Sequence, residues 1–419
     1  MSDLSTDDRT YASPRSLEGL LQRGRGLGAL RAPGELGTSA EPVAEVVRQD
    51  WRWDMTVDDR DLYLARLVRE SGLGLEPVFA LLAGDDDECE RATGILELLA
   101  LSGSVEAREG LRRYVREGEH WADVLESVAH AWPVEWWDDL AGVARERLGG
   151  DRPRLWRSEP WVRWRAGAGA NAPVPAHRTH TIDIGPSRSR LLAVLADGGS
   201  PRGAKRQALW ALAGRPPEPA LIPLVPDLAE ANGELPLPGL GAAVLRLGPL
   251  AVPEARAWAV DGRPTLSWIG VRVLAQHGTV QDLPALMAEL SAHEEARQWC
   301  GPDQLATGIA RFGPAGAEAA PVLRRLWLRT PHSYERPAYL KALAAVAPAG
   351  LDFAFTESLW DCEANARLLG IAHAPDLPHV RERLTWLRDD PMEDAEVRAA
   401  AGNRLVTGVR QARTFRPNT

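Results

Sequence analysis

The chain contains 419 residues, of which 45% are hydrophobic and 26% are charged, as in ordinary folded proteins. No run approaches the roughly 20 apolar residues that span a membrane as a helix, and residues 1–8 are too acidic and polar for a secretory signal peptide. The three cysteines, Cys89, Cys300 and Cys362, are too widely separated for a disulfide framework or a zinc knuckle. We therefore expect a cytoplasmic protein with no membrane partner.

The net charge of −9 hides an uneven distribution of charge along the chain. Residues 1–144 carry 29 acidic and 15 basic side chains, whereas residues 145–190 carry four acidic and ten basic side chains. Residues 191–419 are nearly neutral. An acidic front, a basic bridge and a neutral remainder predict regions with different roles.

Helical periodicity stops and resumes along the chain, which predicts five regions. They are a disordered N-terminus (1–16), an acidic helical block (17–148), an irregular bridge rich in arginine and tryptophan (149–186), a second helical block (187–408) and a tail (409–419). No sustained alternation typical of half-buried strands occurs, and residues 179–184 are the only extended candidate. The predicted fold class is all-α.

The first block shows one amphipathic stripe clearly. A helix is predicted over 76–82, followed by a tight turn over 84–87. The next helix is predicted to begin near Glu88, because Cys89, Ala92, Leu96 and Leu99 recur at i, i+3, i+7 and i+10. Further helices of similar length are predicted over 104–115, 121–131 and 136–148.

The second block is more regular and predicts pairs of helices with a period of about 32 residues. The second helix of each pair is predicted to begin near Arg202, Gly239, Thr265, Asp303, Glu335, Ala364 and Asp394. Prolines recur near helix starts across both blocks, where the missing amide has no intrahelical partner. These prolines are Pro42, Pro77, Pro223, Pro253, Pro284, Pro321 and Pro378.

Together with the acidic turns at 86–92 and 394–400, the helix-start prolines resemble those of HEAT-type repeats, including the short variety first associated with phycobilin lyases. The resemblance implies an α-solenoid, that is, an armadillo/HEAT-like superhelix of stacked antiparallel helix pairs. It also implies that the acidic turn caps the second helix and that a nearby arginine braces the next repeat. It covers most of residues 40–148 and 187–408 and carries almost no information on activity.

The bridge is the sharpest local anomaly, because residues 152–165 interleave three tryptophans with five arginines. Such a segment can stack on bases and pair with phosphates, bind an acidic protein, or lie against the acidic block of its own chain. All three alternatives remain open at this point. The candidate partner-binding residues here are Trp156, Arg157, Trp161, Arg163, Trp164 and Arg165.

A second set of candidates lies off the apolar stripe of the second helices, where a solenoid would present its inner surface. Solvated surface and bracing between repeats are the alternative interpretations of the same pattern. The set consists of Arg206, Trp210, Arg246, Arg272 and Arg398.

No catalytic, metal or cofactor motif is recognisable. The acidic residues at 85–90 lack the spacing of a calcium loop and fit a helix N-terminus better. His177 and His180 have no further ligand nearby, and we expect no metal site there. Hydrolase elbows, zinc-protease motifs and phosphate-binding loops are absent from the sequence, so no cofactor is expected.

The expected function is therefore a non-enzymatic scaffold that binds an unknown protein partner on its concave face. One alternative is a DNA-binding enzyme resembling the HEAT-like alkylpurine DNA glycosylases. Because the chain is acidic overall, that alternative requires a strongly segregated basic track along the DNA. A lyase-type chaperone for a modified protein is a further alternative, which rests on the repeat type alone.

Overall fold

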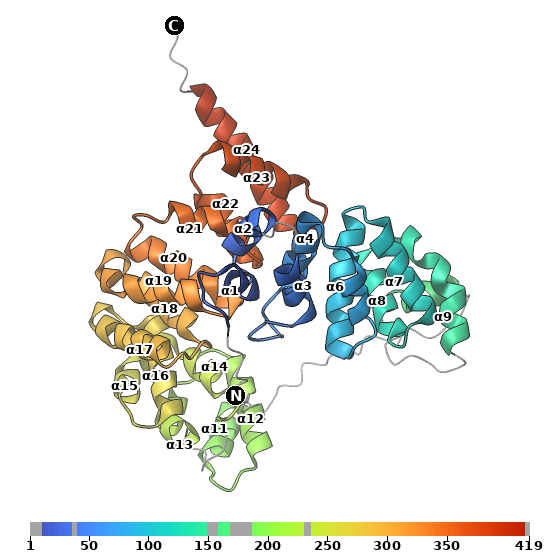
Figure 1. Ribbon diagram of the computed structural model, residues 1–419. Helices are drawn as coiled ribbons and strands as arrows, with labels where there is room; N and C mark the ends of the chain where they lie inside the picture. Colours follow the sequence, from blue (N-terminus) through green and yellow to red (C-terminus); the bar gives the residue numbers. More distant parts are fainter. Residues whose placement is uncertain (1–10, 36–39, 149–157, 168–186, 230–235, 415–419) are drawn as a thin grey trace. The chain divides into compact units, whose positions relative to one another are not determined.

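A computed structural model describes residues 11–35, 40–148, 158–167, 187–229 and 236–414 (Figure 1). Within these ranges all regular structure is helical, with 24 α-helices, short 3₁₀ helices and no strand, which confirms the all-α prediction. The contacts divide the chain into two compact units. The described part of unit 1 covers residues 187–229, 236–330 and 335–350, and unit 2 holds the remaining described residues.

Unit 1 is built from helix pairs whose second members contact one another in chain order. These second helices are α12 (Arg202–Ala213), α14 (Leu240–Leu245), α16 (Pro264–His277), α18 (Pro302–Ala310) and α20 (Arg336–Val346). The first members are α11 (Arg188–Ala196), α13 (Val225–Ala229), α15 (Val252–Trp258), α17 (Leu283–Glu295) and α19 (Ala320–Arg329). Each predicted start of a second helix in this unit lies within one residue of the observed start.

The prolines occupy the first turn of a helix at six of the seven predicted positions, from Pro42 in α3 to Pro378 in α23. The prediction is wrong for Pro223, which lies inside the 3₁₀ helix η3 (Pro219–Leu224). Pro226 takes the early position in α13 instead. Because the sequence offers two prolines three residues apart, spacing alone could not choose between them.

Arginines at the ends of second helices bind carbonyl groups at the end of the preceding second helix in unit 1. Arg246 Nε donates to Arg215 O at 3.0 Å. Arg311 donates to Ala275 O at 2.6 Å and to Gly278 O at 3.1 Å. Carbonyl groups at a helix C-terminus lack intrahelical donors, so a cation there satisfies them and complements the helix dipole.

Unit 2 combines the N-terminal helices with the C-terminal ones. The N-terminal helices are α1 (Leu17–Gln22), α2 (Gly26–Glu35), α3 (Glu41–Arg48), α4 (Asp61–Ser71), α5 (Glu76–Leu81), α6 (Asp86–Leu101), α7 (Val105–Glu117), α8 (Trp121–Ala131), α9 (Ala141–Leu148) and α10 (Trp161–Gly167). The C-terminal ones are α21 (Asp352–Ser358), α22 (Ala364–His373), α23 (Pro378–Asp389) and α24 (Ala395–Thr414). Helices α2, α4, α6 and α8 contact in chain order, and α2 also contacts α21.

The same arginine contacts recur in unit 2. Arg147 donates to Val115 O at 3.0 Å and to Gly118 O at 2.7 Å. Arg404 donates to Ala374 O at 2.6 Å and also to Ile371 O. We call Arg147, Arg246, Arg311 and Arg404 the arginine braces.

Several predicted boundaries in unit 2 need correction. Helix α6 begins at Asp86, ahead of the predicted Glu88, because the Asp85 side chain caps it in a reciprocal capping box with Glu88. The helix predicted over 136–148 begins only at Ala141, after two 3₁₀ turns. Residues 11–16, expected to be disordered, contact the first helices, with Ser16 as the N-cap of α1.

Candidate functional site

The described part of the bridge packs against the acidic N-terminal block. Trp161 is 5% exposed, and its indole Nε1 donates to Glu126 Oε1 at 2.5 Å. Its ring centroid lies 6.4 Å from that of Trp121 and 5.6 Å from that of Trp164. These contacts correspond to the intramolecular alternative that the sequence left open.

One carboxylate binds the other two described candidates of the bridge, Arg163 and Trp164. Asp138 Oδ1 accepts from Trp164 Nε1 at 3.0 Å and from Arg163 Nε at 3.0 Å. Arg163 is otherwise exposed. Trp156, Arg157 and the side chain of Arg165 lie outside the described residues, as do His177 and His180, so a binding role for the bridge stays a prediction.

The second-helix candidates separate into exposed and bracing residues. Arg206 and Trp210 lie one turn apart on α12, and Trp210 is 58% exposed. Arg246 is exposed but also acts as a brace. Arg272 is half-buried and donates to Gln304 Oε1 at 2.6 Å, which links α16 to α18. Arg398 is exposed on α24 in unit 2.

The second helices of unit 1 carry a basic bias that the whole chain lacks. Within their bounds the one acidic residue is Asp303. The basic residues within the same bounds are Arg202, Lys205, Arg206, Arg272, Arg336 and Lys341. This row is therefore positively charged in a protein whose net charge is −9, a pattern that attracts acidic partners.

Charged side chains from distant parts of the sequence meet in the interior of unit 2, which the sequence did not predict. We call this group the charged core. Each member is at most 7% exposed. Its members are Arg25, Asp58, Arg60, Arg66, Glu357, Asp361, Glu363, Arg367, Asp390 and Glu393.

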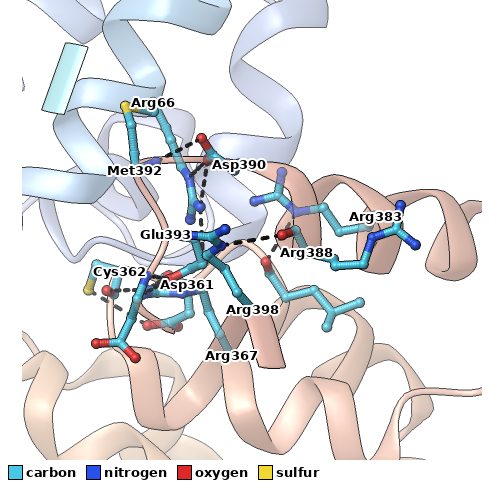
Figure 2. Close-up of polar contacts among 12 residues, drawn as sticks. Arg66, Asp361, Cys362, Arg367, Arg383, Arg388, Asp390, Met392, Glu393 and Arg398 are labelled. Atoms are coloured by element: carbon cyan, nitrogen blue, oxygen red, sulfur yellow. Dashed lines mark hydrogen bonds and ion pairs between the residues drawn. The ribbon is translucent and has the colours of Figure 1, made fainter. Parts of the chain in front are cut away.

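Arg66 of α4 forms the centre of one half of the charged core (Figure 2). Its Nη2 lies 2.9 Å from Asp390 Oδ2 and 2.9 Å from Glu393 Oε2. The other oxygen of Glu393 accepts from Arg367 Nη2 at 2.8 Å. Although burial opposes it, the positive charge of Arg66 holds the pKa of Asp390 below its usual value. Glu393 thus ties α4 to α22.

Asp58 forms the centre of the other half. Its Oδ1 contacts His332 Nδ1 at 2.8 Å and accepts from Ser333 Oγ and the Tyr334 amide, each at 2.9 Å. Despite burial, His332 and Arg60 hold the pKa of Asp58 well below its usual value. Ser333 donates to carboxylates and not to His332, so these residues do not form a Ser–His–Asp catalytic arrangement.

A third cluster surrounds Trp386 on α23. The guanidinium carbon of Arg383 lies 3.9 Å from the Trp386 ring centroid and 4.6 Å from that of Trp360. Arg66 and Arg69 also lie over Trp386, at 4.6 Å and 5.0 Å. Burial, and after it the charge of Arg66, lowers the pKa of Arg383 well below its usual value.

Two carboxyl groups between α4 and α6 titrate near neutrality. Burial raises the pKa of Asp61 to about 7, and burial with the Asp61 charge raises that of Glu97 to about 7. A Cβ on Gly94 would come within 2.2 Å of Asp61 Oδ2, so glycine lets this carboxylate lie against α6. Glu97 Oε1 has no hydrogen-bond partner among the described residues. Such groups can exchange protons at neutral pH.

Sequence reasoning missed these clusters because their residues look like ordinary capping and surface charges. Residues 361–363 precede α22, and residues 390–393 precede α24, where acidic residues normally cap helices. A weak signal was present, since Trp360 and Trp386 lie beside these acidic residues and large aromatic rings favour partial burial.

The described residues contain no group of His, Cys, Asp and Glu suited to a metal ion and no helix long and apolar enough to cross a membrane. Comparison with protein-family models, with curated proteins and with solved structures finds no match to this chain.

Proposed function

We propose that this chain is a HEAT-like α-solenoid that acts as a non-enzymatic scaffold and binds an acidic protein along the second helices of unit 1. The observation that carries the proposal is Trp210, which is 58% exposed one turn from the exposed Arg206. Tryptophan and arginine dominate binding hot spots, and an exposed tryptophan is costly to keep in water.

The packing of unit 1 supports the repeat architecture. Its second helices contact one another in chain order, and its braces join residues 31 to 36 positions apart. In a solenoid of helix pairs, each repeat contacts mainly its neighbours, and the inner helices line an extended concave face. Arg206, Trp210 and Arg246 are then displayed along that face.

Charge supports an acidic partner. Apart from the buried Arg336, the second helices of unit 1 carry five basic residues and one acidic residue within their bounds. Complementary charge accelerates encounter and selects the partner, while the aromatic side chain supplies apolar contact area.

The test is recovery of partners from the native host by the full-length protein and by R206A/W210A. We expect the double variant to lose at least about tenfold of a specific partner, because hot-spot truncations cost 2 kcal/mol or more. The matched control is R324A/V260A, which removes exposed residues that lie outside the second helices.

Equal recovery by the two double variants would contradict the proposal. A salt-dependent gel shift with duplex DNA provides the second arm. Binding of DNA that is lost in R206A/W210A would favour the glycosylase-like alternative over the scaffold.

A further inference from the structure

Arg383 is a buried arginine of unit 2 that has no ion pair with a carboxylate among the described residues. It is 6% exposed, and its one hydrogen bond among the described residues runs from Nε to Leu359 O at 3.2 Å. Its terminal nitrogens, Nη1 and Nη2, have no hydrogen-bond partner among the described residues, and neither is completely sealed from solvent.

Arg383 differs from the other arginines that lie over Trp386. Three guanidiniums lie over this ring, those of Arg66, Arg69 and Arg383 (Figure 2 labels Arg66 and Arg383). Arg66 and Arg69 each have an ion pair with Asp390. Arg383 has no ion pair among the described residues.

We propose that Arg383, with the indole rings of Trp360 and Trp386, is a binding site for a single carboxylate group. With Nε engaged, Nη1 and Nη2 present two parallel N–H donors, which match the two oxygens of a carboxylate. A carboxylate brings one negative charge to the one guanidinium over Trp386 that has no ion pair among the described residues. The indole rings supply flat apolar walls for the carbon atoms of the ligand.

Site-resolved chemical modification tests the proposal on the full-length protein. Phenylglyoxal reacts with free guanidinium groups, and peptide mass spectrometry reports the rate at each arginine. The probes are sodium acetate and a tetraglutamate peptide, compared with sodium phosphate and sodium chloride at equal ionic strength. Protection by acetate indicates a small acid as ligand, and protection by the peptide alone indicates a protein-borne carboxylate.

We expect modification of Arg383 to slow roughly threefold at a carboxylate concentration about twice the dissociation constant. Arg388, exposed on the same helix and paired with Asp389, serves as the internal control and should not change. Equal rates at Arg383 in all four salts, or protection by phosphate alone, would overturn the proposal.

A variant series provides a second readout that does not require the arginine to be chemically reactive. Acetate should raise the melting temperature of the unmodified protein and of R388M, but not that of R383M. R383K, which keeps the charge and loses the two-pronged edge, should respond weakly. A full acetate response in R383M or R383K contradicts the site.

Discussion

The contacts that stabilise unit 1 internally and those that stabilise unit 2 internally differ in how far apart their residues lie in the sequence. In unit 1 the ion pair between Arg256 and Asp282 spans 26 residues, and the braces span 31 to 36. In unit 2 the pair Arg25–Glu357 spans 332 residues, Arg66–Asp390 spans 324, and Asp58–His332 spans 274. Unit 1 is therefore stabilised by neighbours in sequence, whereas unit 2 needs two distant segments to find each other.

The difference extends to burial. Asp282 is buried, but its partner Arg256 has a side chain that is 39% exposed, so water screens the pair. The Arg66, Asp390 and Glu393 side chains are 6%, 1% and 0% exposed. A buried charge without its partner is much more costly than a screened one. The charged core consequently penalises any arrangement of unit 2 that leaves a charge unpaired.

The largest expected effect comes from R66M, which keeps most of the side-chain volume but leaves Asp390 and Glu393 without their shared partner. Removing one member of a buried ion pair costs about 3–5 kcal/mol. We expect the free energy of unfolding of unit 2 to fall by about this amount, measured by native-state hydrogen exchange in α4 and α22. R256M in unit 1 is the matched control and should leave exchange in that unit nearly unchanged.

The double variant R66M/D390N separates pairing from packing. It should recover a large part of the stability lost in R66M, because position 390 no longer carries a buried charge and Glu393 keeps its ion pair with Arg367. If R66M and R256M shift exchange equally, the contrast between the two units is wrong.

An intermediate effect is expected from E97Q, and it depends on pH. The folded-state pKa of Glu97 is raised to about 7, above its ordinary value of 4.5, because burial disfavours the charged form. Burial of this group therefore costs little below pH 4.5, and the cost grows as the pH rises toward 7 and is complete above it. One pKa unit corresponds to about 1.4 kcal/mol, so E97Q should stabilise the protein by roughly 1–3 kcal/mol at pH 8.

The measurement is urea unfolding of E97Q and of the unmodified protein at pH 4.5 and pH 8. At pH 4.5 the two curves should nearly coincide. E106Q, on the exposed start of α7, serves as the control and should show no such pH dependence. A stability difference that is the same at both pH values would contradict a raised pKa for Glu97.

Sequence reasoning located helices well because helix starts depend on neighbouring residues. Proline at the first turn and an acidic cap act within a few positions, so the starts of α17, α19 and α23 are readable from their prolines and that of α6 from its cap. The exception at Pro223 arises where two prolines compete.

The charged core could not be read in the same way. The identity of the partner of Arg66 depends on a fold that brings residue 390 beside residue 66, and no local pattern encodes that meeting. Arg206 and Trp210 lie off the apolar stripe in the sequence and are exposed in the structure, and their role in binding a partner stays a prediction. Composition alone does not distinguish a binding segment from a packed one at Trp161. The ring of Trp161 packs against Trp121 and against Trp164, which belongs to the same tryptophan-rich segment.

The smallest expected effect concerns the arginine braces, which occur in both units. R311M in unit 1 removes donors to Ala275 O and Gly278 O, and R404M in unit 2 removes donors to Ile371 O and Ala374 O. Each should cost about 1 kcal/mol, because exposed carbonyl groups regain water when the charged donor is lost. Faster hydrogen exchange should be confined to the last turn of α16 or of α22. R324M, which removes an exposed arginine that is not a brace, is the control.

Because the local contacts are alike, similar effects in the two units would show that the braces act independently of the charged core. A much larger effect of R404M would instead mean that helix stacking in unit 2 depends on its long-range contacts. The two units would then differ in the contribution of their arginine braces as well.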